Sequence, residues 1–281
     1  MFLRALLALL LLLPAHAPAA EVDVTVEPLA IGDTFTIESA VLGETRRINV
    51  YRAPGYGAAP DAPLPVLYMP DGGIAEDFLH VAGLVQVSVM SGTMRPFMLV
   101  GIENTERRRD LTGPTDDPQD REIAPRVGGS AEFRAFLRGE LMPAIEARYR
   151  TTDETAIVGE SLAGLFVLET LVLEPALFDS YIAIDPSLWW NRHALLAQLD
   201  ALLETGPELA NAVFIASSDE PGLAGPAARF AEALQQASPP ALRMHYLPMP
   251  EERHATIYHP AALRAFRLLF APAPAPADDA R

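Results

Sequence analysis

Short apolar runs and longer amphipathic stretches alternate along most of the chain, which is the pattern of a protein built from strands and helices in turn. The first two apolar runs alternate in polarity, which is typical of antiparallel strands with one solvated face. The later runs are continuously apolar, which is typical of buried parallel strands. Eight strands are expected, over residues 34–39, 46–54, 65–70, 96–104, 155–159, 180–185, 211–219 and 241–249.

Helical periodicity separates most of these strands. The six amphipathic stretches lie near residues 77–90, 130–148, 162–173, 193–204, 225–237 and 260–270. An antiparallel start followed by repeated strand–helix units predicts an α/β fold with a mostly parallel, doubly wound, eight-stranded sheet and an antiparallel N-terminal edge. Residues 107–129 are polar, rich in Pro and Gly and without periodicity, so we expect a long functional or mobile loop there.

The two ends of the chain differ from the rest. Residues 1–19 combine a basic start, a short apolar run and an Ala-x-Ala sequence, which predicts a secretory signal peptide and therefore export to the periplasm or the medium. The Ala/Pro-rich residues 271–281 predict a disordered tail. Residues 20–270 are then expected to form one domain, and no further apolar run is long enough to span a membrane.

Composition narrows the function. The formal net charge is −16, which argues against nucleic acid and anionic membrane surfaces as partners. The chain has no Cys, so disulfides, thiolate metal sites and a Cys nucleophile are excluded. No His/carboxylate motif for a metal occurs either, and no cofactor is expected. The oligomeric state leaves no signature in the sequence.

Ser161 stands between an apolar strand and an apolar helix, in the sequence GESLAG. A strand–Ser–helix turn with small flanking residues is typical of a nucleophile elbow, in which a strained backbone exposes the hydroxyl. Gly159 provides the first small residue, and Ala163 occupies the position where a second Gly is usual. The alternative is that Ser161 only caps the helix that follows.

A hydrolase of this type needs a His after the last strand and an acid after a late strand. His254 lies in the loop that follows the last predicted strand, and His259 is the second choice. The acid is predicted at Asp219, at the end of the penultimate strand, with Glu220 and Asp185 as alternatives. Carboxylates at strand ends also cap helices or face water, so position alone separates these candidates.

Backbone amides and aromatic residues complete the predicted site. The amide of Leu162, at the helix N-terminus, and that of Gly72, in the loop after the third strand, are the expected oxyanion donors. Trp189 and Trp190 follow a strand end and are candidates for substrate binding. Arg109, in the densest basic cluster of the chain, is a candidate for contacting an anionic substrate, although charge runs are usually solvated surface.

The assembled segments resemble the esterase branch of the α/β-hydrolases, specifically the enterochelin and siderophore esterase-like family. The matching segments are PVLYMPDGG, VGIENTERRRDLTGPT, RAFLRGELMPAIEARYRT, VGESLAGLFVLETLVLEPALFDSYIAIDPSLWWN and HATIYHPAALRAF. The resemblance implies an α/β-hydrolase fold, with Ser161 as nucleophile and His254 as base. It also implies a less uniform acid, because some members are described as using a Ser–His dyad. Glu160 and Ala163 depart from the His and Gly that are usual in the family.

These observations predict a secreted serine carboxylic ester hydrolase acting on a small-molecule ester through an acyl-enzyme. The resemblance adds siderophore-type esters as the substrate class. Two alternatives use the same fold: an acyltransferase that passes the acyl group to another alcohol, and a non-catalytic ligand-binding protein.

Overall fold

The protein is described here by a computed structural model that covers residues 24–53, 59, 61–205, 209–237 and 241–273. The chain divides into two units, Met1–Ala30 and Ile31–Arg281. In the first unit, residues 24–30 have no regular secondary structure. The predicted signal peptide and all but the first three residues of the predicted tail lie outside the described residues.

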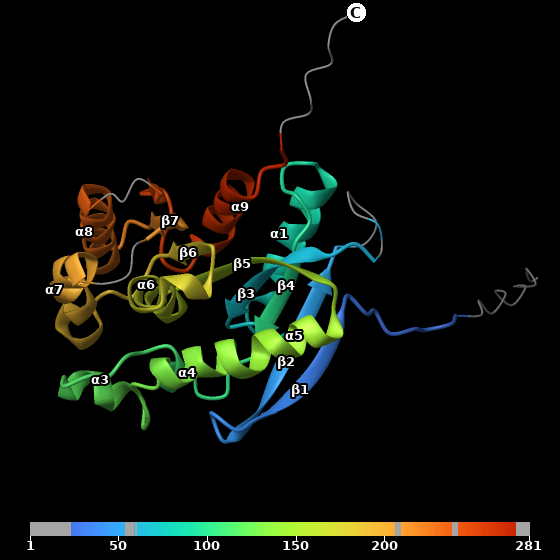
Figure 1. The fold of residues 1–281 in the computed structure, drawn as a ribbon, viewed down its shortest axis with the longest axis horizontal. Helices are drawn as coiled ribbons and strands as arrows, with labels where there is room; N and C mark the ends of the chain where they lie inside the picture. Colours follow the sequence, from blue (N-terminus) through green and yellow to red (C-terminus); the bar gives the residue numbers. More distant parts are fainter. Residues whose placement is uncertain (1–23, 54–58, 60, 206–208, 238–240, 274–281) are drawn as a thin grey trace, which may run out of the picture. The chain divides into compact units, whose positions relative to one another are not determined.

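The second unit is built on an eight-stranded sheet, as the sequence predicts (Figure 1). The strands lie in the order β1-β2-β4-β3-β5-β6-β7-β8. β1 and β2 pair with each other in antiparallel fashion, β2 is antiparallel to β4, and all later pairs are parallel. The strands are β1 (Asp33–Ser39), β2 (Glu44–Arg52), β3 (Leu64–Pro70), β4 (Met98–Ile102), β5 (Thr151–Glu160), β6 (Ser180–Ile184), β7 (Ala212–Ser217) and β8 (Arg243–Pro248). This is the sheet of an α/β-hydrolase, with the predicted antiparallel edge.

Helices cover both faces of the sheet and bury a separate apolar cluster on each (Figure 1). One face carries α1 (Phe78–Met90) and α9 (Tyr258–Leu269). The other carries α4 (Ser130–Phe136), α5 (Met142–Arg148), α6 (Leu162–Leu173), α7 (Trp190–Thr205) and α8 (Pro221–Ala237). Because the central strands are covered on both sides, β3, β4, β6 and β7 are buried along their whole length, which explains their continuous apolar sequences. No helix in the described part of the chain is long and apolar enough to cross a membrane.

Two predicted elements differ from what the structure contains. The single helix expected over residues 130–148 is interrupted by a π-helical segment, η1 (Leu137–Leu141). Pro143 explains it, because Pro has no N–H to donate to the carbonyl of Gly139 four residues earlier. The expected loop at 107–129 contains two short helices, α2 (Arg107–Asp110) and α3 (Pro118–Ile123). Each is too short to produce a periodic apolar pattern.

Candidate active site

Ser161 lies at the carboxyl end of β5 in a strained backbone conformation. Its φ of 60° and ψ of −119° place it outside the regions that residues with a Cβ normally adopt. The turn is held by hydrogen bonds on both sides: the Ser161 amide donates to the carbonyl of Ile184, and its carbonyl accepts from the amides of Leu165 and Ser187. These contacts hold the Ser161 backbone in a sharp strand-to-helix bend, as in a nucleophile elbow.

The predicted elbow needs small residues because larger side chains would clash with neighbouring atoms. A Cβ added to Gly159 would lie 2.6–2.7 Å from atoms of Ala163, and one added to Gly164 would lie 3.0 Å from the carbonyl oxygen of Ile184. Ala163 therefore fits in place of the usual second Gly because Gly159 has no side chain to oppose its methyl group. The amide of Leu162 begins α6, where helix geometry leaves it without an intrahelical acceptor.

The imidazole of His254 pairs with Asp185. His254 Nδ1 lies 2.7 Å from Asp185 Oδ2, and the Asp185 carboxylate is completely buried while 37% of the His254 side chain is exposed. Asp185 also accepts hydrogen bonds from the amide and the hydroxyl of Ser218, at 2.9 and 2.7 Å. The backbone of Asp185 is left-handed, with φ 46°, and its amide donates to the carbonyl of Ala216. Every oxygen of this buried carboxylate thus has a donor.

This contact corrects the expected position of the acid. Asp219, the first choice from the sequence, is exposed, and its carboxylate makes no hydrogen bond or ion pair with any residue that the structure describes. Its amide donates to the carbonyl of Glu252, which ties the β7–α8 loop to the loop that carries His254. Asp185, an alternative from the sequence, occupies the position beside His254 because its left-handed backbone turns the carboxylate under the β8–α9 loop.

The electrostatics of the pair follow from its contacts. The hydrogen bond to Asp185 raises the pKa of His254, against the effect of partial burial, and the nearby carboxylates of Glu160 and Glu220 raise it further. Burial alone would raise the pKa of Asp185, but the hydrogen bonds from His254 and Ser218 outweigh it, so the pKa of Asp185 is lowered. Burial raises the pKa of Glu160, beside Ser161, to about 7.

Ser161 and His254 line one pocket, with a volume of about 370 Å³. We call it the Ser161 pocket; it is lined by Ser161, Ser187, Trp189, Glu220, Gly222, Leu223 and His254. The hydroxyl of Ser187 is 3.2 Å from that of Ser161, and Ser187 is only 2% exposed. The sequence analysis missed Ser187. Its place two residues after Asp185, at the end of β6, is the signal that could have found it.

Of the two predicted tryptophans, only Trp189 lines this pocket. Trp190 is 5% exposed and donates from its indole nitrogen to the carbonyl of Gly113, at 2.9 Å. Trp189 is half-buried, and the two rings lie 6.0 Å apart. The prediction that both rings bind substrate is therefore wrong for Trp190, which is buried and holds the segment in place. Trp189 lines the pocket and remains a candidate.

The residues after Trp190 form an unusual turn. Asn191, Arg192 and His193 all have left-handed backbone conformations, with φ of 47°, 52° and 65°. The turn is tied to the 113–120 segment: the Asn191 amide donates to Asp120 at 2.9 Å, and Arg192 pairs with Asp117 at 3.0 Å. These contacts stabilise a backbone that costs about 1 kcal/mol or more per residue.

Gly72 does not provide an oxyanion donor in this structure. Its amide donates to the carbonyl of Ile102 at 2.9 Å. A Cβ at Gly72 would meet the Ile102 nitrogen at 2.2 Å, so Gly is needed here for the close approach of the β3–α1 loop to β4. The next amide, of Gly73, donates to the carboxylate of Glu76 at 2.7 Å.

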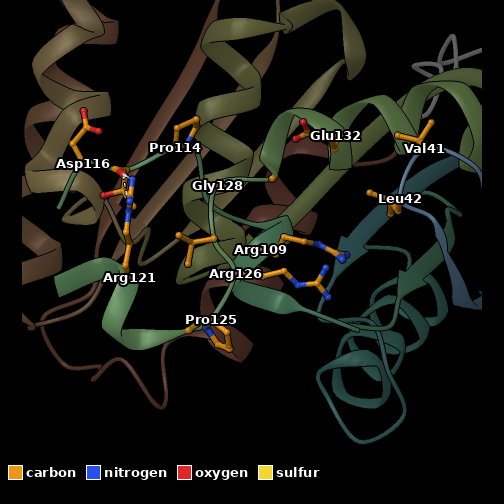
Figure 2. A pocket seen from close by; sticks show the side chains of 14 residues that line it. Val41, Leu42, Arg109, Pro114, Asp116, Arg121, Pro125, Arg126, Gly128 and Glu132 are labelled. Atoms are coloured by element: carbon orange, nitrogen blue, oxygen red, sulfur yellow. Dashed lines mark hydrogen bonds between the residues drawn. The ribbon is translucent and has the colours of Figure 1, made fainter. Parts of the chain in front are cut away.

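Arg109 lies in a second hollow, of about 690 Å³, formed mainly by the 107–129 segment (Figure 2). We call it the loop groove; it is lined by Val41, Leu42, Arg109, 114–116, Arg121, 124–129 and Glu132. Arg109 contacts Glu44 at 2.7 Å and Asp110 at 2.6 Å. Figure 2 shows the Arg109 and Arg126 side chains running side by side, and both pair with Glu106. Arg109 is thus part of an ion-pair network and does not line the Ser161 pocket.

Comparison with known proteins relates the chain to esterases. The curated Ferri-bacillibactin esterase BesA of Bacillus subtilis is 33% identical over 172 residues, covering 56% of this chain and 59% of BesA. The siderophore triacetylfusarinine C esterase of Aspergillus fumigatus is 38% identical over 104 residues, covering 35% of this chain and 34% of that enzyme. The alignments thus span about three-fifths or less of these relatives.

Solved structures match over more of the chain. An IroE-like serine hydrolase from Shewanella oneidensis superposes with a TM-score of 0.75 at 29% identity, covering 85% of this chain and 80% of that one. The BES protein from Bacillus cereus shares the fold, with a TM-score of 0.77 at 23% identity, covering 89% and 99% of the two chains. The family model described as "putative esterase" matches residues 39–251, a span that includes Ser161 and Asp185. The chain therefore belongs to this esterase family.

Proposed function

We propose that the protein is an exported serine ester hydrolase that works through an acyl-enzyme on siderophore-type esters. The observation that carries the proposal is the arrangement of three side chains: a buried Asp185 carboxylate bonded to His254, and His254 sharing one pocket with Ser161. Nucleophile, base and orienting carboxylate are the parts that acyl transfer to a hydroxyl requires. Family membership, the names of the siderophore esterases and the serine hydrolase neighbour support the assignment.

In the first half of the reaction, Ser161 Oγ attacks the ester carbonyl and its proton passes to His254 Nε2. Asp185 holds Nδ1 and stabilises the imidazolium that forms. The amide of Leu162, at the positive end of α6, stabilises the oxyanion. His254 then gives the proton to the leaving alcohol, and the acyl group remains on Ser161.

In the second half, water attacks the acyl-enzyme and loses a proton to His254. The tetrahedral intermediate collapses, the carboxylic acid leaves, and His254 returns the proton to Ser161 Oγ. The 37% exposure of the imidazole supports hydrolysis over transfer to another alcohol, because water reaches the base directly. Siderophore-type esters as substrates, and export, rest on the relatives' names and on the N-terminal sequence respectively.

The test compares the wild type with Ser161→Ala. We expect p-nitrophenyl ester hydrolysis and labelling by a fluorophosphonate probe in the wild type, and a loss of at least about 10³-fold in kcat with no labelling in the variant. Hydrolysis that survives in Ser161→Ala would contradict the proposal. Product analysis with an added alcohol acceptor separates hydrolysis from acyl transfer, and absence of both labelling and turnover in the wild type would favour a binding protein.

A further inference from the structure

The Ser161 pocket carries negative charge in its wall and little positive charge. Among its lining residues, Glu220 is the carboxylate and His254 the group that can become cationic. His254 is bonded to the buried Asp185, so a proton on the imidazole is already matched by a negative charge. Glu220 lines the same pocket as His254, and the half-buried Glu160 is next to Ser161 in the chain. A ligand in this pocket therefore meets excess negative charge.

The arginines of the 107–129 segment, and Arg192, are bound to other groups. None of the described residues that line the Ser161 pocket is an arginine. In the 107–129 segment, Arg107 pairs with Asp71, Arg109 with Glu44 and Asp110, and Arg126 with Glu106. Arg108 donates to the carbonyl of Ile123, and Arg121 donates to that of Thr115. Arg192, three residues after Trp189, pairs with Asp117. An anionic ligand thus finds no unpaired guanidinium lining this pocket.

Besides the carboxylate of Glu220, the pocket contains an aromatic ring, that of Trp189. Its indole lines the pocket together with Glu220, whereas Trp190 is buried and committed to the carbonyl of Gly113. The face of an indole ring attracts a cation through its quadrupole, and Trp is the strongest of the aromatic side chains in this respect. The turn at 191–193, tied to the 113–120 segment, fixes the backbone next to this ring.

We propose that the Ser161 pocket recognises a positively charged group of the ester substrate, held between the carboxylate of Glu220 and the ring of Trp189. The substrate class is an ester that carries an ammonium group close to the scissile bond, such as an amino-acid ester or the ester of an amino alcohol. The proposal concerns the substrate of the same site and rests on the proposed esterase function for its kinetic test. An exposed ion pair and a cation–π contact together favour the cationic substrate by roughly three- to thirtyfold.

The kinetic test uses three butyrate esters of similar shape and different charge. Their alcohols are choline, the neutral isostere 3,3-dimethylbutanol and the anionic 2-hydroxyethanesulfonate. We expect kcat/KM to fall in this order in the wild type, with the difference mainly in KM. Glu220→Gln should bring the choline and neutral esters to within about threefold of each other. Glu232→Gln, an exposed carboxylate on the helix that follows Glu220, is the matched control and should leave the order unchanged.

The binding test does not depend on catalysis. The chain has two tryptophans, so its intrinsic indole fluorescence reports on Trp189 and its buried neighbour. Ser161→Ala protein is titrated with tetramethylammonium chloride and, separately, with sodium chloride at equal ionic strength. We expect a saturable fluorescence change with the organic cation alone, and its weakening at least threefold in Ser161→Ala/Glu220→Gln.

The outcomes separate the two proposals. Equal kcat/KM for the three esters, or a preference that survives Glu220→Gln together with identical titrations by both salts, overturns the cation site and leaves the esterase function standing. Saturable cation binding in a protein whose wild type hydrolyses neither these esters nor p-nitrophenyl esters, and does not react with the fluorophosphonate probe, contradicts the esterase function and leaves the cation site standing.

Discussion

The Ser161 pocket and the loop groove differ in how well the charged residues of the sequence indicate the chemistry of the site. The groove contains Arg109, Arg121 and Arg126, from the most basic stretch of an acidic chain, yet their guanidinium groups are bound to carboxylates or backbone carbonyls. The Ser161 pocket has few charged residues, but one of them, His254, has a raised pKa because it is hydrogen-bonded to the buried Asp185. The difference teaches that local density of charge in a sequence marks ion-pair networks as readily as binding sites.

The largest expected effect comes from substituting each of the two candidate acids in turn. We expect Asp185→Asn to lower kcat about 10²- to 10⁴-fold, because the imidazole loses the carboxylate that orients it and stabilises its cation. Asp219→Asn is the matched control and should stay within about twofold, since Asp219 is exposed and the imidazole of His254 bonds to Asp185 instead. Initial rates with a p-nitrophenyl ester measure both. The reverse ranking would return the catalytic acid to position 219.

The second test asks whether Arg109 is structural. Arg109→Ala should lower the free energy of unfolding by about 1–3 kcal/mol, because Glu44 and the buried Asp110 lose a charged donor. The kcat/KM for small esters should stay within about twofold. Denaturant unfolding and initial rates give the two quantities. A fall in kcat/KM at unchanged stability would assign Arg109 to substrate binding.

The same network predicts a pH dependence of stability. Hydrogen bonding to Arg109 lowers the pKa of Glu44 from its usual 4.5 to about 2. A carboxyl whose pKa is depressed on folding stabilises the protein above its unfolded pKa and loses that contribution as the pH falls through the folded pKa. The destabilisation by Arg109→Ala should therefore be full above pH 4.5 and shrink towards pH 2.

The third test concerns the hydroxyl beside the nucleophile. Ser187→Ala should lower kcat about three- to tenfold with little change in KM, because Ser161 Oγ loses the hydrogen bond that fixes its position. Ser187→Cys keeps a weak donor and should recover part of the rate. An unchanged kcat in Ser187→Ala would show that the 3.2 Å contact has no part in the reaction.

The smallest expected effect is a shift in the pH profile. His254 must be neutral to accept the Ser161 proton, and its raised pKa places the acid limb of kcat/KM above its usual value near 6.5. Glu160→Gln removes a carboxylate that favours the charged imidazole, so the limb should move to lower pH by up to about one unit. Glu232→Gln should leave it in place. A shift to higher pH would show that Glu160 acts otherwise than through its charge.

Much of the fold was predictable because its signals are local. Continuous apolar runs such as that of β3 follow directly from burial on both faces, and the Gly159–Ser161 elbow has a steric requirement that only small residues meet. The 107–129 segment was not predictable as helices, because α2 has four residues and α3 six. The position of His254 after β8 also followed from chain order.

The parts of the site that sequence reasoning misplaced depend on contacts between distant segments. Choosing between Asp185 and Asp219 requires knowing that the backbone of Asp185 is left-handed and that the Asp219 amide bonds to Glu252. From the sequence, the Gly72 amide could donate to an oxyanion, but in the structure it donates to the carbonyl of Ile102 in β4, thirty residues later. Neither fact leaves a trace in residue type or spacing.

The turn at Asn191–His193 has a consequence for how such enzymes diversify. It joins the chain carrying the Trp189 indole to residues 113–120, which lie outside the sheet and provide none of the three proposed catalytic groups. We expect an insertion or deletion there to displace the turn at 191–193 and with it the Trp189 ring. Ser161 and His254 should keep their positions, because strands β5 and β8 set them. Changes in residues 113–120 can therefore alter which esters the pocket accepts, while the catalytic residues keep their positions.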